Sequence, residues 1–64
     1  PHALRHAAIL GALASLTPGR AMALVAPHDP LPLLAQIADA YGDTVEVGYR
    51  ERGPESWTLT FTRI

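Results

Sequence analysis

Alternation of apolar and polar residues in the last third of the chain is the feature that most restricts how it folds. In residues 45–50 (VEVGYR) and again in residues 57–62 (WTLTFT), every second side chain is apolar. The segment RGPES between them contains glycine and proline, which mark a turn. The pattern predicts an antiparallel hairpin with one buried and one solvated face, so we expect helices to cover only one side of the sheet.

The first segment of the chain has helical periodicity. We expect a helix over about His2–Leu16, because its larger apolar side chains recur at spacings of three and four. Thr17-Pro18-Gly19 ends this helix, since proline cannot continue it and glycine tolerates a left-handed cap. The stripe consists of Ile9, Leu10, Leu13 and Leu16.

A second helix is expected between Asp29 and Gly42. Aspartate is a favoured N-cap and proline suits the first helical position, so Asp29 is the predicted cap and Pro30 the first helical residue. Gly42 supplies the C-terminal cap. The apolar stripe predicted for this helix is Leu31, Leu34, Ile37, Ala38 and Tyr41.

The run AMALVA, residues 21–26, predicts a strand that is covered on both faces or lies centrally in a sheet. The resulting order of helix, strand, helix resembles the tail of a βαβα unit, in which a strand precedes the first helix. We therefore expect a first strand to be missing from this sequence, because it was removed, is disordered or is supplied by a neighbour. The edge of AMALVA would then expose unpaired backbone groups that a second chain can cover.

Length and composition restrict the function. The 64 residues form one domain, residues 1–64, and contain no cysteine, which excludes disulfides, thiolate nucleophiles and zinc–thiolate sites. A net charge of −1 without a basic stripe argues against nucleic acid as a partner. No segment approaches the roughly 20 apolar residues of a membrane span. The N-terminal residues indicate a core helix and not a signal peptide, so we expect a cytoplasmic protein.

Four segments together resemble a known family. RHAAI, LTPG, LV-x-x-HDPLPLL and ERGPESWTLTFTR are similar, in order and spacing, to the domain-of-unknown-function family 2249, and the resemblance runs from Arg5 to Arg63. It implies a bacterial two-layer α/β (α+β) sandwich of the TusA type. Its elements would follow the order βαβαββ, with a mixed sheet and both helices on one face. One departure is Pro27, which stands where the family often carries an acidic or amide residue.

The resemblance also has functional implications. TusA-type sulfur carriers hold a persulfide on a cysteine, and this chain has none, so that activity is excluded for the residues present. Members of the family resemble accessory domains associated with hemerythrin-like or cupin-type proteins. This association implies a redox context, although a fold alone assigns no function.

Candidate ligand-binding residues lie where the strands end and the helices begin, which is where ligands bind in α/β folds. Arg5 and His6 lie in the first turn of the first helix, and His28 and Asp29 follow the strand AMALVA. If the missing strand runs parallel to AMALVA, both histidines fall at one edge of the sheet, with His2 nearby.

Three hypotheses compete for this edge. His6 and His28, with a carboxylate, are residue types that hold a divalent metal or contact haem. An anion could instead bind the second helix N-terminus, although Pro30 and Pro32 each lack an N–H there. The third and favoured interpretation is structural: Asp29 caps the helix and His28 hydrogen-bonds the turn.

No catalytic motif is present, and neither Ser15 nor Ser56 has an evident base nearby. We therefore expect a non-catalytic accessory or regulatory module with no required cofactor. It would bind a protein partner or a second copy of itself, with a metal or haem at the His6/His28 edge as an additional ligand. The alternative is a component of a sulfur-transfer or redox system whose reactive residue lies outside this sequence.

Overall fold

The elements follow the order helix, strand, helix, strand, strand that the sequence predicted. The structure, a computed structural model, describes the backbone of residues 2–64 and the side chains of residues 4–64. The helices are α1 (His2–Ser15) and α2 (Leu31–Tyr41), and a short 3-10 helix, η1 (Gly42–Thr44), follows α2. The strands are β1 (Ala21–Ala26), β2 (Val45–Arg52) and β3 (Trp57–Arg63).

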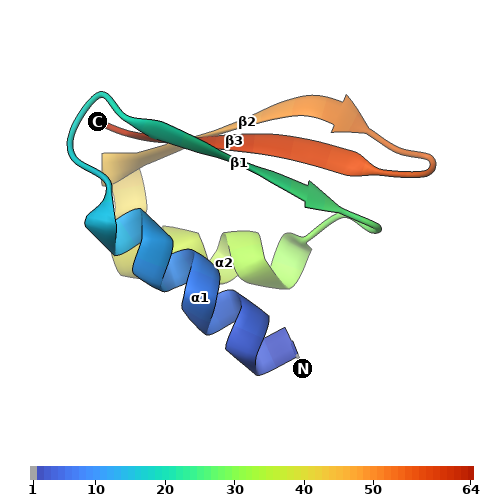
Figure 1. Cartoon of the computed structure of the whole chain (residues 1–64), viewed down its shortest axis with the longest axis horizontal. Coiled ribbons are helices and arrows are strands. Elements are labelled where there is room, and N and C mark those ends of the chain that lie inside the picture. Colours follow the sequence, from blue (N-terminus) through green and yellow to red (C-terminus); the bar gives the residue numbers. More distant parts are fainter. Residues whose placement is uncertain (1) are drawn as a thin grey trace.

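The three strands form an antiparallel sheet in the order β1-β3-β2, so the last strand lies in the centre. In its register Leu59 of β3 lies between Leu24 of β1 and Tyr49 of β2, and a bulge follows Tyr49. Both helices pack on the same face of this sheet (Figure 1). The expected hairpin and the two-layer α/β sandwich are therefore confirmed.

β1 differs from its prediction, because it lies at an edge of the three-stranded sheet and only one of its faces is covered. Met22 and Leu24 are half-buried and Ala26 is buried on the helix side, whereas Val25 on the other face is 63% exposed. The run is apolar throughout, but no second layer covers its outer face (Figure 1). The parallel pair of a mixed sheet would require the additional first strand, which is not among the described residues.

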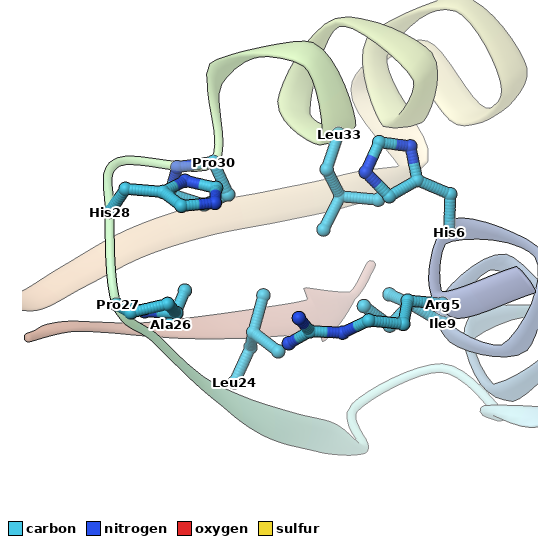
Figure 2. Close-up of a pocket in the computed structure, with 9 residues that line it drawn as sticks. All are labelled: Arg5, His6, Ile9, Leu24, Ala26, Pro27, His28, Pro30 and Leu33. Carbon is cyan, nitrogen blue, oxygen red and sulfur yellow. The ribbon is translucent and has the colours of Figure 1, made fainter. Parts of the chain in front are cut away.

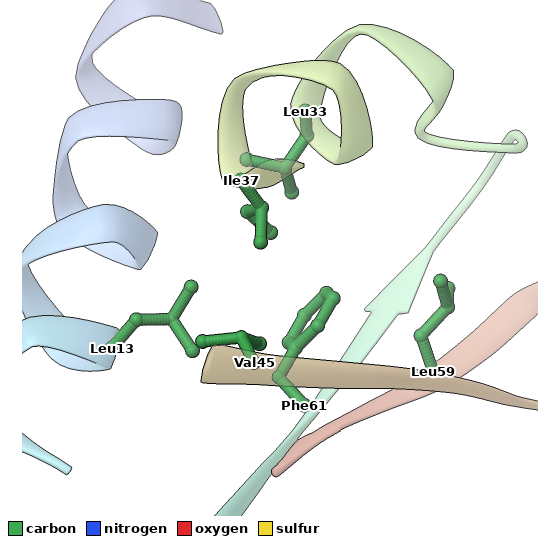
Figure 3. Packing of buried hydrophobic residues seen from close by; sticks show 6 residues of the cluster. All are labelled: Leu13, Leu33, Ile37, Val45, Leu59 and Phe61. Carbon is green, nitrogen blue, oxygen red and sulfur yellow. The ribbon is translucent and has the colours of Figure 1, made fainter. Parts of the chain in front are cut away.

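The core lies between the two helices and the inner face of the sheet (Figure 3). Its buried side chains come from both helices, from the first residue of β2 and from alternate positions of β3. The half-buried residues Ile9, Leu10 and Leu16 pack against it around Leu13, which confirms the stripe predicted for the first helix. The buried cluster consists of Leu13, Leu33, Ile37, Val45, Leu59 and Phe61.

The stripe predicted for α2 is partly wrong. Leu33 and Ile37 are almost fully buried, whereas Leu31 is 61% exposed and Ala38 is exposed. The buried face of α2 is centred on Leu33 and Ile37, which lie four residues apart. Leu34 and Tyr41 only flank the core. Periodicity alone could not choose between these two phases, because leucine occupies residues 31, 33 and 34 alike.

The predicted helix ends are close to those observed. Gly42 has φ +55°, and its N–H donates to the Ala38 carbonyl, as expected of a C-terminal cap. After α1, Gly19 has φ +87° and its N–H donates to the Arg63 carbonyl at 2.7 Å. This bond ties the turn before β1 to the end of β3. No helix of the described chain has the length and apolar character needed to cross a membrane.

Candidate functional site

One pocket opens between α1, the end of β1 and the start of α2 (Figure 2). The structure brings three of the predicted residues into its lining: Arg5 and His6 from α1, and His28 from the loop after β1. His6 and His28 thus line the same pocket, whereas their role in binding a ligand stays a prediction. The side chain of His2, which was expected nearby, lies outside the described residues. The full lining is Arg5, His6, Ile9, Leu24, Ala26, Pro27, His28, Pro30 and Leu33.

The pocket has apolar surfaces with basic or aromatic nitrogen groups at its sides. Figure 2 shows the Arg5 guanidinium extending from α1 toward Leu24, and the His6 ring beside Leu33. His28 lies on the opposite side, next to Pro30. The polar side chains of this lining are one arginine and two histidines, and none of its members is acidic.

Asp29 is not in the lining, because its carboxylate is held elsewhere. Tyr49 of β2 donates its hydroxyl hydrogen to Asp29 Oδ1 at 2.6 Å. This hydrogen bond, burial and the negative charge of Asp29 raise the pKa of Tyr49 above 10.0, and the charge of Arg52 opposes the rise. The Arg52 guanidinium carbon lies 3.8 Å from the centroid of the Tyr49 ring, in a cation–π contact.

Asp29 is not the helix cap that the sequence predicted. The N-cap of α2 is Pro30, and no side chain makes a capping hydrogen bond there. The physical reason lies in the donors: Pro32 has no N–H, and the Leu31 N–H donates to the Asp29 main-chain carbonyl at 2.9 Å. The Asp29 carboxylate is left to accept from Tyr49 instead.

The loop supports one part of the structural interpretation and weakens the anion hypothesis. His28 Nδ1 lies 3.4 Å from the Asp29 carbonyl oxygen, a long contact within the turn, so the HDP sequence does turn the chain.

An anion at the start of α2 would find one backbone donor fewer, because the Leu31 N–H already donates to the Asp29 carbonyl. Anion binding by the helix end is therefore disfavoured by the local hydrogen bonds.

The described side chains do not form a complete set of metal ligands. Among side chains 4–64, no group of three or more His, Cys, Asp or Glu residues is placed to hold an ion. Metal sites in proteins commonly use three or four protein ligands, and this pocket offers two imidazoles beside a guanidinium. The metal role of His6 and His28 thus stays a prediction without a complete ligand set.

The size of the pocket restricts its ligand. Its volume is about 30 Å³, whereas about 10–15 Å³ holds one water-sized group. A group of a few non-hydrogen atoms enters such a space. A haem does not, and would have to lie across the pocket mouth.

Comparison with known proteins places these residues in a family. A family model described as "Uncharacterized conserved protein (DUF2249)" matches residues 1–63. The chain belongs to family DUF2249. The match includes every residue of the pocket as well as the Asp29–Tyr49 pair of this DUF2249 domain. Searches of curated proteins and of solved structures found no match.

Sequence reasoning identified Arg5, His6 and His28 but missed Tyr49. In the sequence, Tyr49 is one more apolar position of an alternating strand, and its ring indeed packs against the core. Its hydroxyl group, however, extends to Asp29, 20 positions away in the sequence. No local pattern signals this bond, because it depends on how β2 lies relative to the loop after β1.

Proposed function

We propose that this DUF2249 domain is a non-catalytic accessory module that docks a partner protein over the Arg5/His6/His28 pocket. The observation that carries the proposal is the position of exposed apolar side chains. Leu4 and Leu31 are 68% and 61% exposed. Leu4 directly precedes Arg5 and Leu31 directly follows Pro30, and both of these neighbours line the pocket.

These two leucine side chains are called the apolar rim below. Single exposed leucines are ordinary on protein surfaces, but exposed apolar side chains beside a pocket are typical of interaction sites. Arginine is also enriched in interfaces, and Arg5 lines the pocket. Contrary to the expectation from the sequence, Ser56 does have a carboxylate nearby: its hydroxyl donates to Glu51 Oε1 at 2.8 Å. This exposed pair is not in the pocket lining, so the apolar rim beside the pocket supports protein recognition more than catalysis.

The remaining expectations belong to the same proposal. A TusA-type relationship, a bacterial source, a cytoplasmic location and a redox context are consistent with an accessory module of this size. The proposal also allows a metal or haem as an additional ligand of His6 and His28, but the described donor set and the volume of the pocket disfavour both.

Site-specific photo-crosslinking in cells tests the docking. A benzoylphenylalanine at residue 4 or 31 should crosslink to one protein, identified by mass spectrometry, whereas the same group at Ile64 should not. Ile64 is a matched control, because it is 64% exposed but is not next to a lining residue. The identified protein, once purified, should bind the wild-type chain and bind a Leu4→Ser/Leu31→Ser variant at least about tenfold more weakly. Crosslinks to a second copy of this chain, or equal crosslinking from residue 64, would overturn the proposal.

A further inference from the structure

The charge distribution of the pocket indicates what it recognises. Arg5 lines the pocket, and its guanidinium makes no ion pair or side-chain hydrogen bond with any residue of the described chain. The nearest acidic residue in the loop, Asp29, accepts a hydrogen bond from Tyr49 and is absent from the lining. A positive charge is thus available in a pocket without a negative one.

This arrangement selects against cations. A metal ion bound between His6 and His28 would share the pocket with the Arg5 guanidinium, and like charges at short range repel. An anion experiences the opposite effect, and arginine has the planar donor geometry that suits a carboxylate. The charge therefore favours an anionic group on different grounds from the helix-end hypothesis, which used only backbone N–H donors.

The size and walls of the pocket favour a carboxylate on a short aliphatic stem. The volume of about 30 Å³ admits a few non-hydrogen atoms, as in a carboxyl group with its neighbouring methylene. Ile9, Leu24 and Leu33 supply apolar walls for the stem, and Arg5 supplies the charged donor. A larger anion such as a nucleotide would remain mostly outside.

We propose, building on the docking function above, that the pocket receives the carboxylate of an aspartate or glutamate side chain of the partner protein, with apolar residues beside it packing on the rim. Leu4 and Leu31 would contact the residues that flank the acidic one. The rim argues for a partner side chain over a free carboxylate, because a free small acid would leave these leucines exposed. An exposed ion pair alone contributes little to affinity, whereas one enclosed by apolar contacts is screened less.

Short peptides test the ligand class without knowledge of the partner. Acetyl-Leu-Glu-Leu-amide, titrated into the ¹⁵N-labelled protein, should shift the amide resonances of the pocket residues saturably. Acetyl-Leu-Gln-Leu-amide, which keeps the shape but loses the charge, should bind about tenfold or more weakly. Sodium acetate should bind more weakly than the glutamate peptide, since it lacks the apolar neighbours. Equal binding of the two peptides would overturn the charge argument, and equal binding of acetate would overturn the partner side chain as the source.

Arginine variants locate the interaction. Arg5→Gln should lower the affinity for the glutamate peptide about tenfold and leave the affinity for the glutamine peptide unchanged. Arg20→Gln should change neither affinity. Arg20 is a matched control, because it is exposed and precedes β1 at the end opposite the pocket. Zinc chloride provides a further arm: stoichiometric Zn²⁺ binding that Arg5→Gln strengthens, without peptide binding, would overturn the proposal.

The two proposals fail in different ways. If a crosslinked partner still binds Arg5→Gln normally but is lost with Leu4→Ser/Leu31→Ser, docking stands and carboxylate recognition is wrong. If the glutamate peptide binds in an Arg5-dependent way but no protein crosslinks at the rim, carboxylate recognition stands and docking by a cellular partner is wrong.

Discussion

Tyr49 donates its hydroxyl hydrogen to Asp29 Oδ1 at 2.6 Å, and this bond joins β2 to the loop that carries His28. The bond removes the acidic side chain from the pocket and anchors the residue next to His28. Arg52, stacked on the Tyr49 ring, supports the same arrangement from the side of β2. The charge of the pocket is thus set partly by a residue outside it.

The Tyr49–Asp29 bond should be visible in a pH titration. The chain has two tyrosines, so the absorbance of tyrosinate in a Tyr41→Phe background reports Tyr49 alone. We expect its pKa to lie above 10.0, because the phenol proton is held by Asp29, and to fall toward 10.0 in Asp29→Asn. A midpoint at or below 10.0 with Asp29 present would contradict the bond.

The same shift gives the sign of a stability change. The raised pKa means that the folded state keeps a proton that the unfolded state loses first. The contribution of Tyr49 is therefore complete below pH 10 and declines as the pH rises through the pKa of the folded state. In urea unfolding experiments above pH 10, the free energy of unfolding should decline less with rising pH for Tyr49→Phe than for the wild type.

Two leucines of α2 should differ sharply in their importance for stability. Leu33→Ala should lower the free energy of unfolding by about 2–5 kcal/mol, because it opens a cavity in the core. Leu31→Ala, at a side chain that is 61% exposed, should change it by about 0.5 kcal/mol or less. Urea denaturation of the pair measures both, and similar losses would show that the helix is rotated differently.

Gly53 should tolerate no side chain. Its φ is +73°, and a Cβ there would lie 2.7 Å from Cζ2 of Trp57. Gly53→Ala should therefore destabilise the protein by about 1–3 kcal/mol, with a change in Trp57 fluorescence. Gly11→Ala is the opposite case: its Cβ meets nothing within 4 Å in α1, so we expect a gain of about 0.5–1 kcal/mol.

Tyr41 should hold α1 in place. Its hydroxyl donates to the Leu10 carbonyl oxygen at 3.0 Å, which links the end of α2 to the middle of α1. Tyr41→Phe should cost about 0.5–1.5 kcal/mol and speed hydrogen exchange in α1 more than in the sheet. Thr44→Val, which removes an exposed bond to the Tyr41 carbonyl, is the matched control. Uniform acceleration across all elements would contradict a local role.

Most of the fold was predictable because its signals are local. The alternation of β3 and the spacing of Ile9 and Leu13 each reflect one face of one element, and the structure confirms both. The phase of α2 was not predictable, since residues 31, 33 and 34 are all leucine and the choice depends on the shape of the sheet beneath them.

The candidate site was predictable for a topological reason. Because the single strand β1 returns the chain between α1 and α2, both helices begin near the same edge of the sheet, which brought Arg5, His6 and His28 together. The fate of Asp29 was not predictable, because aspartate before proline is an ordinary cap signal. Here the proline at position 32 removes one donor and a tyrosine from β2 supplies another.

The central place of β3 has a consequence for synthesis on the ribosome. β1 and β2 both emerge before the strand that pairs with each of them, and neither pairs with the other. Until residues 57–63 have emerged, the nascent chain can form its helices but none of the strand pairs of the described sheet. The sheet then closes from both sides around one late strand, so the chain is most exposed to chaperones and proteases just before that strand appears.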